Sequence, residues 1–460
     1  MTDFKPSDLD RLDQERRTSY DTYLDFYSGT QWTGTSRERR LVFNYAKVSI
    51  DKMTSYLMQG LTFPCYPVED TDEAHARVDK AEYLLRQVYE DNNLQELDWE
   101  TEIDAAVLGD ASYKVIWDTQ EKRIKIVSPD VRGLFAWWIG DDLSRVWRVA
   151  LRYELTADEL AVLYRLKLTK NKATVVELWT DKTFELWIDN DKVQARSNPY
   201  GFIPFLIFPN IRQPKQFWGT SDIVPLVEPQ RELNRALSQL SRILELSGNP
   251  IAVLENVGSS EDIQVKPGAV WTIPEDAKAY LLDLLQGGGI RLHIDYIDTI
   301  YRCLHDISET PRAAYGGTER DISGAALTIE LGSLVQKVMR KRTIRTAVYH
   351  RRTDMIFKLA ERYLKEDFSG ITHRVVWGPI LPADVARQAQ NEQLLVQSGI
   401  HSRKTAMDEL GIQDPEAEFK RWLEERATIR KQNIDLPLPS TRGGPKARTY
   451  ESKPEDNEEQ

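Results

Sequence analysis

Seven cationic side chains form the densest charged run in the sequence. They are Lys337, Arg340, Lys341, Arg342, Arg345, Arg351 and Arg352. Lysine and arginine donate charge-assisted hydrogen bonds either to phosphates or to carboxylates, so the run is compatible with a nucleic-acid patch or with pairing to acidic groups. On a helix it covers more than one face. We favour pairing with acidic side chains of a neighbouring subunit, and expect Arg340, Arg342 and Arg345 at such an interface.

A glycine-containing segment before this run carries a second group of hydrogen-bond donors. The segment spans Pro311 to Ser323, has no apolar period and is expected to form a mobile loop. Four of its side chains could touch the phosphates of DNA: Arg312, Tyr315, Thr318 and Arg320. A solvated surface loop explains the same pattern. The stretch from Gly317 to Gly324 is similar to a phosphate-binding loop, but no Lys-Ser or Lys-Thr pair follows Gly324, so it does not predict nucleotide hydrolysis.

No residues have the spacing of a catalytic or metal-binding motif. The six histidines form no HExxH or HxH pair, and the two cysteines, Cys65 and Cys303, are far apart with no CxxC spacing. The pair Asp141-Asp142 lies in a turn signal without a nearby base. We therefore expect no enzyme activity, no cofactor, no bound metal and no disulfide.

The elements that would position these groups are helical at the start of the chain and then extended. Apolar residues recur at helical spacing between Asp10 and Leu108, and Gly109 ends this region. From Ser112 to Phe208, short segments rich in Val, Ile, Trp and Tyr alternate with turn signals, which predicts a mostly antiparallel sheet. The fold class expected from this order is α+β.

Two helices of similar length follow, with a small β-containing module between them. The first opens after Gly219-Thr220-Ser221-Asp222 and carries an apolar stripe that we expect at a subunit interface, made of Leu233, Leu237, Leu240 and Leu244. The second runs from Ile290 to Ser308. A helix, a module and a returning helix predict a protruding stalk. A single long helix is then expected from Ala325 to about Lys365, because that stretch has no proline and one glycine.

Composition limits the classes of protein that fit. The 460 residues exceed the size at which one core keeps growing, so several packed regions are expected. The formal net charge of −11 disfavours tight DNA binding, but an acidic wall lets DNA slide past it. No apolar run is long enough for a membrane helix, and no signal peptide is recognisable.

Local motifs, in their order, resemble the portal proteins of tailed bacteriophages, particularly the siphophage type of Gram-positive hosts. The residues that carry the resemblance are Ile203-Pro204-Phe205, Asn210, Gly219-Thr220-Ser221-Asp222, Leu233-Asn234, Lys266-Pro267-Gly268, Ser323-Gly324-Ala325-Ala326-Leu327, Ser398-Gly399-Ile400-His401-Ser402 and Gly411-Ile412-Gln413-Asp414-Pro415-Glu416. Each motif is weak alone, and their order and spacing make the resemblance specific.

The resemblance implies a multi-domain portal fold with a wing, a helical stem, a clip, a tunnel loop and a helical crown. By matching position, the parts are 1–218 (wing), 219–247 (first stem helix), 248–289 (clip), 290–308 (second stem helix), 309–323 (tunnel loop), 324–381 (long helix and return to the wing), 382–432 (crown) and 433–460 (a disordered tail). It also implies a homo-oligomeric ring, typically a dodecamer, at the capsid vertex of the virion.

The function expected from the resemblance is that of a head-tail connector with a channel for double-stranded DNA. Such a subunit serves genome packaging and ejection without reading sequence, and is assembled in the host cytoplasm. Implied partners are the terminase large subunit, a head-tail adaptor, and scaffolding and major capsid proteins, with no membrane. The rival hypothesis is a phage-associated DNA-processing enzyme, such as a metal-dependent nuclease or a nucleotidyltransferase.

Overall fold

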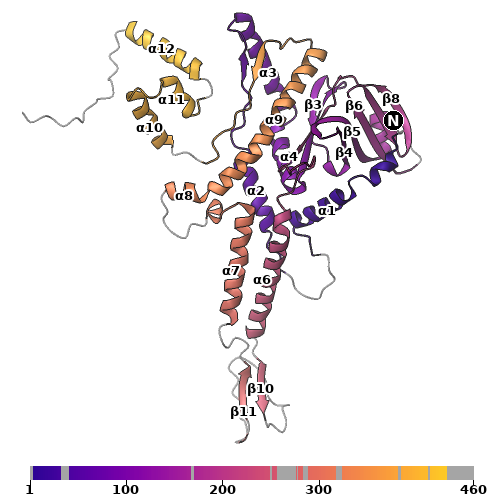
Figure 1. The fold of residues 1–460 in the computed structure, drawn as a ribbon, viewed down its shortest axis with the longest axis vertical. Coiled ribbons are helices and arrows are strands. Elements are labelled where there is room, and N and C mark those ends of the chain that lie inside the picture. The colour runs from indigo at the N-terminus through magenta and orange to yellow at the C-terminus, as the bar shows by residue number, and fades with distance from the viewer. Residues whose placement is uncertain are drawn as a thin grey trace, which may run out of the picture. The chain divides into compact units, whose positions relative to one another are not determined.

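The computed structural model describes residues 4–32, 41–166, 170–248, 251–255, 276, 278–282, 289–316, 324–381, 385–412 and 415–431. The chain divides into two compact units, Met1–Leu381 and Pro382–Gln460. Helices and antiparallel sheets both contribute, which confirms the α+β class (Figure 1). None of the helices in the described ranges has the length and apolar character needed to cross a membrane.

The first unit begins with helices whose ends follow local sequence signals. After a short 3-10 helix, Pro6–Asp10, come α1 (Gln14–Ser28), α2 (Tyr45–Leu57), α3 (Asp72–Asp91) and α4 (Leu94–Leu108). The Thr71 hydroxyl accepts a hydrogen bond from the Ala74 amide and caps α3. Gly109 ends α4 with a φ of 94°, which favours glycine. The expected helical start of the chain is therefore present.

Two antiparallel sheets follow, where the sequence predicts a single, mostly antiparallel sheet. The three-stranded sheet has the order β3 (Arg123–Val127), β2 (Asp110–Asp118), β9 (Phe205–Pro209). The five-stranded sheet runs in chain order through β4 (Leu134–Ile139), β5 (Asp142–Thr156), β6 (Lys172–Thr180), β7 (Thr183–Ile188) and β8 (Asp191–Ser197). Between β5 and β6, Thr156 and Glu159 form a capping box that starts α5 (Ala157–Tyr164).

The long helix that follows the stalk is broken, contrary to the expectation of one continuous helix. It consists of α8 (Gly324–Glu330) and α9 (Gly332–Tyr363), with Leu331 between them at ψ 0°. The Leu331 side chain is buried with Leu334 and Val338, and the neighbouring Gly332 has low helix propensity. The buried Leu331 side chain and the adjacent glycine thus explain the break in the helix. The expectation of a continuous helix was wrong because it relied only on the absence of proline.

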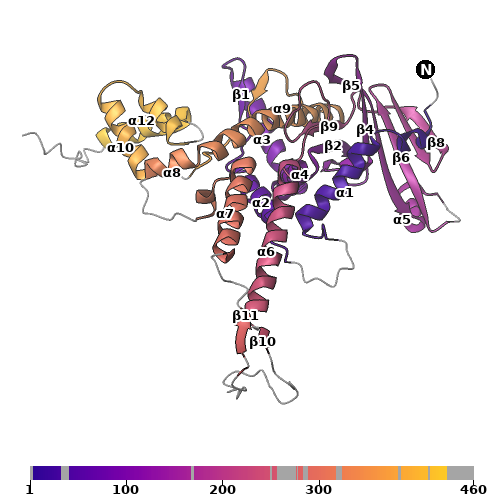
Figure 2. The ribbon, with the colours of Figure 1, turned by 60° about the horizontal axis from the view of Figure 1, so that its bottom comes forward.

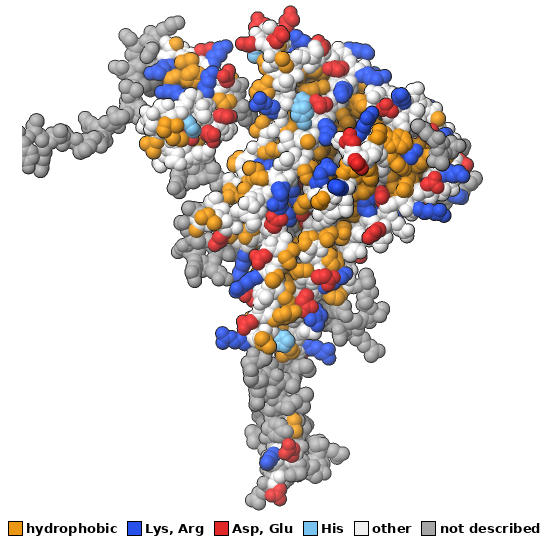
Figure 3. Space-filling model, viewed as in Figure 1, with side chains coloured by type: hydrophobic (Ala, Val, Ile, Leu, Met, Phe, Trp, Pro, Cys, Tyr) orange, Lys and Arg blue, Asp and Glu red, His pale blue; other side chains and the backbone are white. Residues whose placement is uncertain are grey.

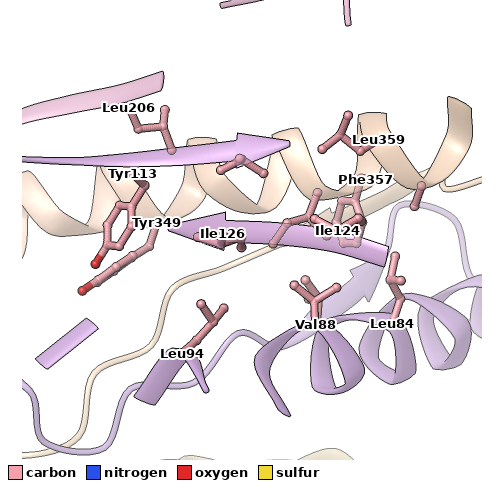
Figure 4. Packing of buried hydrophobic residues seen from close by; sticks show 14 of the residues in the cluster. Leu84, Val88, Leu94, Tyr113, Ile124, Ile126, Leu206, Tyr349, Phe357 and Leu359 are labelled. Carbon is pink, nitrogen blue, oxygen red and sulfur yellow. The ribbon is translucent and has the colours of Figure 1, made fainter. Parts of the chain in front are cut away.

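Helix α9 crosses the core of the first unit. Tyr349, Phe357 and Leu359 pack against Tyr113 and Ile124 of the three-stranded sheet (Figure 4). The same core is completed by α3 and α4, which supply Leu84, Val88 and Leu94. A two-stranded sheet of β1 (Cys65–Pro67) and β12 (Ile371–His373) joins the chain before α3 to the chain after α9.

The stalk consists of α6 (Val227–Gly248) and α7 (Gly289–Ser308), which lie side by side (Figures 1 and 2). Helix α6 begins later than the Ser221-Asp222 signal suggested, because Pro225 starts a 3-10 turn, Val224–Leu226, ahead of it. Between the two helices, β10 (Ile251–Glu255) pairs with β11 (Lys278–Leu282). Most of the β-containing module expected between the two helices lies outside the described residues.

The described residues of the second unit form three helices, α10 (Val385–Gln397), α11 (Arg403–Glu409) and α12 (Pro415–Lys431). The Ser402 hydroxyl accepts from the Thr405 amide and caps α11. Gly399 and Gly411 have φ values of 73° and 78° at the ends of α10 and α11. The expected helical region from 382 to 432 is thus present where it is described.

Candidate functional site at the stalk

The inner face of the stalk is formed within one chain. Leu233 on α6 is 1% exposed and belongs to the same buried cluster as Ile300 and Leu304 of α7. Leu237 is partly buried against this cluster. Two of the four leucines expected at a subunit interface therefore pack inside the chain, because α7 returns along the face of α6 that carries them. Leu240 is half-buried, and Leu244 is 51% exposed.

Helix α7 has a second apolar face, whose side chains stay largely exposed in the described part of the chain. Leu292, Tyr296 and Ile307 are 73%, 46% and 45% exposed, and Cys303 is also exposed. The spacing of these positions places them along one side of the helix. Apolar side chains are visible on the surface of the stalk in Figure 3. We call Leu292, Tyr296, Cys303 and Ile307 the outer α7 face. The sequence analysis missed it, although α7 carries apolar residues at two sets of helical positions.

A third face of α7 is charged and alternates in sign. It carries Arg291, Asp295, Arg302 and Asp306, all of which are exposed. Arg302 pairs with Asp298 one turn earlier at 2.6 Å. Helix α7 therefore presents one face to α6, one apolar face outward and one charged face outward.

The base of the stalk is held to the core by the Gly219-Thr220-Ser221-Asp222 motif. A Cβ atom on Gly219 would lie 2.4 Å from the carbonyl oxygen of Gly109, so only glycine allows this approach. The Ser221 hydroxyl donates to the carbonyl of Ala106 at 3.1 Å, and the Asp222 amide donates to the same carbonyl at 2.9 Å. The motif thus joins the end of α4 to the start of the stalk.

Two lysines of α9 also form ion pairs with the Asp222 carboxylate. Its carboxylate is 3.2 Å from Lys337 Nζ and bonds Lys341 Nζ, and all three side chains are buried. Burial raises the pKa of Asp222, but Lys337 and Lys341 outweigh this and hold the pKa well below its usual range. Lys337 also donates to the carbonyl of Ser308, the last residue of α7, at 2.9 Å. The end of α7 and the segment that precedes α6 are therefore both bonded to α9.

Two arginines of the basic run are paired with carboxylates of α4. Arg345 makes a bidentate contact with Glu102 at 2.7 and 2.9 Å, and Arg352 makes one with Asp98. Arg345 and Arg352 are both 0% exposed. Lys337, Lys341, Arg345 and Arg352 recur at the helical repeat, so they lie on the core side of α9.

Arg342 also forms its hydrogen bonds within the chain. It donates to the backbone carbonyls of Leu57 at 3.1 Å, Tyr56 at 3.2 Å and Gly378 at 2.6 Å, and is 6% exposed. Tyr56 and Leu57 are the last residues of α2, whose terminal carbonyls need such donors. Both Arg342 and Arg345 were expected at a subunit interface. The structure instead buries both, because acceptors distant in sequence converge on them.

The other basic side chains of the run lie on the surface side of α9. Arg340 is exposed and pairs with Glu309 at 2.5 Å, while Arg351 is exposed. Of the three arginines expected at a subunit interface, Arg340 is therefore the one whose side chain is accessible.

The described part of the expected loop is ordered against the stalk. Arg312 and Tyr315 lie in a 3-10 helix, Arg312–Tyr315, directly after α7. The Tyr315 hydroxyl donates to Thr310 Oγ1 at 3.1 Å, and burial raises the pKa of Tyr315. The Arg312 guanidinium lies 5.9 Å from the centre of the Tyr301 ring. Thr318 and Arg320 lie outside the described residues.

One group of side chains in the described ranges could hold a metal ion, and sequence reasoning missed it. It consists of His350 and Asp354 on α9 and His373 on β12. The signal in the sequence was a histidine and an aspartate four residues apart on a helix, and the third residue is brought in by the β1–β12 pairing. By contrast, Asp142 accepts from the Ser144 amide at the start of β5, as expected of a turn residue.

Comparison with known proteins gives one family. The family model described as Phage portal protein, SPP1 Gp6-like matches residues 8–432. A search of curated proteins gives no match. Portal proteins of phages are structural ring-forming components of the capsid vertex rather than enzymes. Since the match covers nearly the whole described chain, the protein belongs to the SPP1 Gp6-like family of phage portal proteins.

Proposed function

We propose that this chain is one subunit of a ring, typically of twelve copies, through which double-stranded DNA enters and leaves the capsid. The observation that carries the proposal is the outer α7 face. This apolar surface lies on a helix that already packs against α6, and its side chains stay largely exposed in the described part of the chain, although the Tyr296 hydroxyl donates to Glu232 of α6. In a closed ring, each copy offers the same surface to its neighbour.

Burial of the outer α7 face would provide a useful part of the assembly energy. Covering a leucine or isoleucine side chain is worth roughly 1.5–3 kcal/mol. Leu292 and Ile307 lie near opposite ends of α7, so contact along the whole helix would bury both. The alternating charges of the adjacent face suit a solvated surface. They do not make the basic groove that would hold DNA by counterion release.

The assembly can be tested with Leu292→Glu combined with Ile307→Glu in the full chain. Two charges on the outer α7 face should abolish rings seen by electron microscopy and native mass spectrometry, while circular dichroism of the subunit stays unchanged. Arg291→Glu is the matched control, because it places a carboxylate one residue away on the charged face. Intact rings in the double variant, or loss of rings in the control, would contradict the proposal.

For the segment after α7, we propose contact with the DNA backbone through Arg312, Tyr315, Thr318 and Arg320. Support comes from Arg312 and Tyr315, which follow the end of α7 directly. Deleting Thr318 to Asp321 should leave rings intact but lower DNA packaging or retention, measured as packaged DNA per particle. Unchanged packaging would rule the segment out as a channel element.

The remaining assignments follow from family membership and are proposals as well. Residues 1–218 would form the wing, 248–289 the clip and 382–432 the crown, with Arg340, Leu240 and Leu244 at the surface between subunits. The terminase large subunit would bind the clip, and the head-tail adaptor, scaffolding protein and major capsid protein would bind elsewhere on the ring. Assembly would take place in the host cytoplasm. Deleting the clip should abolish capture of terminase by assembled rings in a pull-down.

A further inference from the structure

Three side chains that sequence reasoning treated as unrelated converge at one point on the surface of the first unit. His350 and Asp354 are one turn apart on α9, and His373 is on β12. One ligand atom from each, two imidazole nitrogens and a carboxylate oxygen, lies within 4.8 Å of the other two. The group is separate from the stalk and from the buried cations of α9, which have partners of their own.

The distances between these atoms are too long for hydrogen bonds but suit a shared ion. His350 Nδ1 is 3.4 Å from Asp354 Oδ2, and His373 Nε2 is 3.6 Å from Asp354 Oδ1. Hydrogen bonds between nitrogen and oxygen in proteins span roughly 2.7–3.2 Å. Two ligands that each lie about 2.0–2.1 Å from a tetrahedral Zn²⁺ are roughly 3.3 Å apart. The side chains are therefore spaced as ligands around a small ion rather than as bonded partners.

The elements of the fold hold the three ligands in place. His373 is 8% exposed, and its strand is fixed by pairing with β1, where Cys65 lies opposite His373. The centre of its ring lies 5.6 Å from that of Phe357, in an edge-to-face contact, and 4.1 Å from that of His350. Its Nε2 is 3.2 Å from the carbonyl oxygen of His350. An ion bound at Nε2 would replace that contact.

The other two ligands are open to solvent. The side chains of His350 and Asp354 are 50% and 44% exposed. An ion could therefore enter directly from solution, and water could complete its coordination. This combination of one buried ligand and two accessible ones is that of an open metal site rather than of a closed core cluster.

We propose that His350, Asp354 and His373 bind one divalent transition-metal ion of the zinc class, which fastens β12 to α9. Two imidazoles and one carboxylate suit Zn²⁺, Co²⁺ or Ni²⁺, whereas Ca²⁺ and Mg²⁺ prefer oxygen ligands. Because β12 pairs with β1, the ion would also stabilise the link between the chain before α3 and the chain after α9. The site does not depend on ring formation, so it stands or falls separately from the proposed function.

An ordinary exposed pair of histidine and aspartate offers a matched control. His75 Nε2 lies 2.7 Å from Asp70 Oδ1, and both side chains are exposed. The two groups are hydrogen-bonded to each other, and no third ligand is grouped with them in the described ranges. Removing His75 tests whether any surface histidine of this kind would give the same result.

The test uses the full chain without a polyhistidine tag. Calorimetric titration with Zn²⁺ should give one equivalent per chain, and Co²⁺ should give visible absorption bands. His350→Ala and Asp354→Asn should each weaken Zn²⁺ binding by more than ~10-fold, since loss of a group that only orients a metal ligand already costs that much. His75→Ala should leave binding unchanged.

Three results would overturn the proposal. They are no stoichiometric binding by the unaltered chain, unchanged affinity in both His350→Ala and Asp354→Asn, and an equal loss in His75→Ala. Circular dichroism of each variant checks that the fold is kept. Both altered ligands are solvent-accessible, so their substitution is not expected to unfold the chain.

Discussion

At the scale of single residues, the main feature is the set of buried cations on α9. Arg345 pairs with Glu102 and Arg352 with Asp98, and these two acids are one turn apart on α4. Placing ions in the core carries a large desolvation cost, which is offset only when every donor has a partner. Arg345 meets that condition, because its remaining donors reach the carbonyls of Pro209 and Asn210. The pairs fix how α9, α4 and β9 fit together.

Removing one partner should therefore be costly. Arg345→Ala leaves the Glu102 carboxylate buried without its cation, and we expect a loss of about 3–5 kcal/mol in the free energy of unfolding. Arg340→Ala removes an exposed pair with Glu309 and should cost ~1 kcal/mol or less. Urea unfolding followed by circular dichroism measures both variants. Equal effects would show that burial of the Arg345 pair does not govern its contribution.

A buried carboxyl predicts a pH dependence of stability. Burial raises the pKa of Asp110 to about 6, although the Gly219 amide and the Tyr20 hydroxyl donate to it. This is above the value of about 3.9 for an unfolded aspartate, so the folded chain binds the proton more tightly. The resulting stability is present below pH 4 and is lost as the pH rises through 6.

Asp110→Asn should remove this dependence. The amide oxygen can still accept from Gly219, and no charge is buried at neutral pH. Relative to the unaltered chain, the variant should gain up to ~3 kcal/mol in unfolding free energy between pH 4 and pH 7. Unfolding midpoints measured across that range check the prediction. Parallel profiles for the two proteins would mean that Asp110 does not titrate there.

At the scale of elements, most helices and strands could be predicted from the sequence. Which elements each of their faces contacts could not be predicted. The stalk helices follow from apolar spacing and from Pro225 and Gly289. The partners of Arg345 come from α4, from the end of β9 and from the residue after it, and no local pattern brings them together. For the same reason the metal-binding group was missed, since His373 meets His350 only through the β1–β12 pairing.

The close approach of Gly219 to the Gly109 carbonyl at the base of the stalk leads to a prediction at this scale. In Gly219→Ala the new Cβ would overlap the Gly109 carbonyl and the Pro209 ring, at 2.4 and 2.6 Å. Overpacking of this kind typically costs ~1–3 kcal/mol, so the melting temperature should fall. Gly332→Ala is the control, because no atom lies within 4 Å of its Cβ position and alanine favours helix by up to ~1 kcal/mol. A fall in both variants would contradict the steric explanation.

At the scale of the whole molecule, the distribution of charge differs from what the sequence suggests. Five of the seven cations in the basic run are buried in the first unit, so they are not part of its surface. The described buried residues contain six acids and six lysines or arginines, so the formal net charge of −11 comes from the rest of the chain. This agrees with a portal that lets DNA pass, and it removes the strongest argument for a nucleic-acid patch on α9.

The two thiols of the chain differ in a way that gives a chemical reporter of assembly. Burial and Glu82 raise the pKa of Cys65 to about 12, which keeps it as an unreactive thiol, whereas Cys303 is exposed on the outer α7 face. A maleimide dye should therefore label free subunits at Cys303 alone. In assembled rings the same thiol should react far more slowly, so the alkylation rate would follow ring closure in real time without any engineered cysteine.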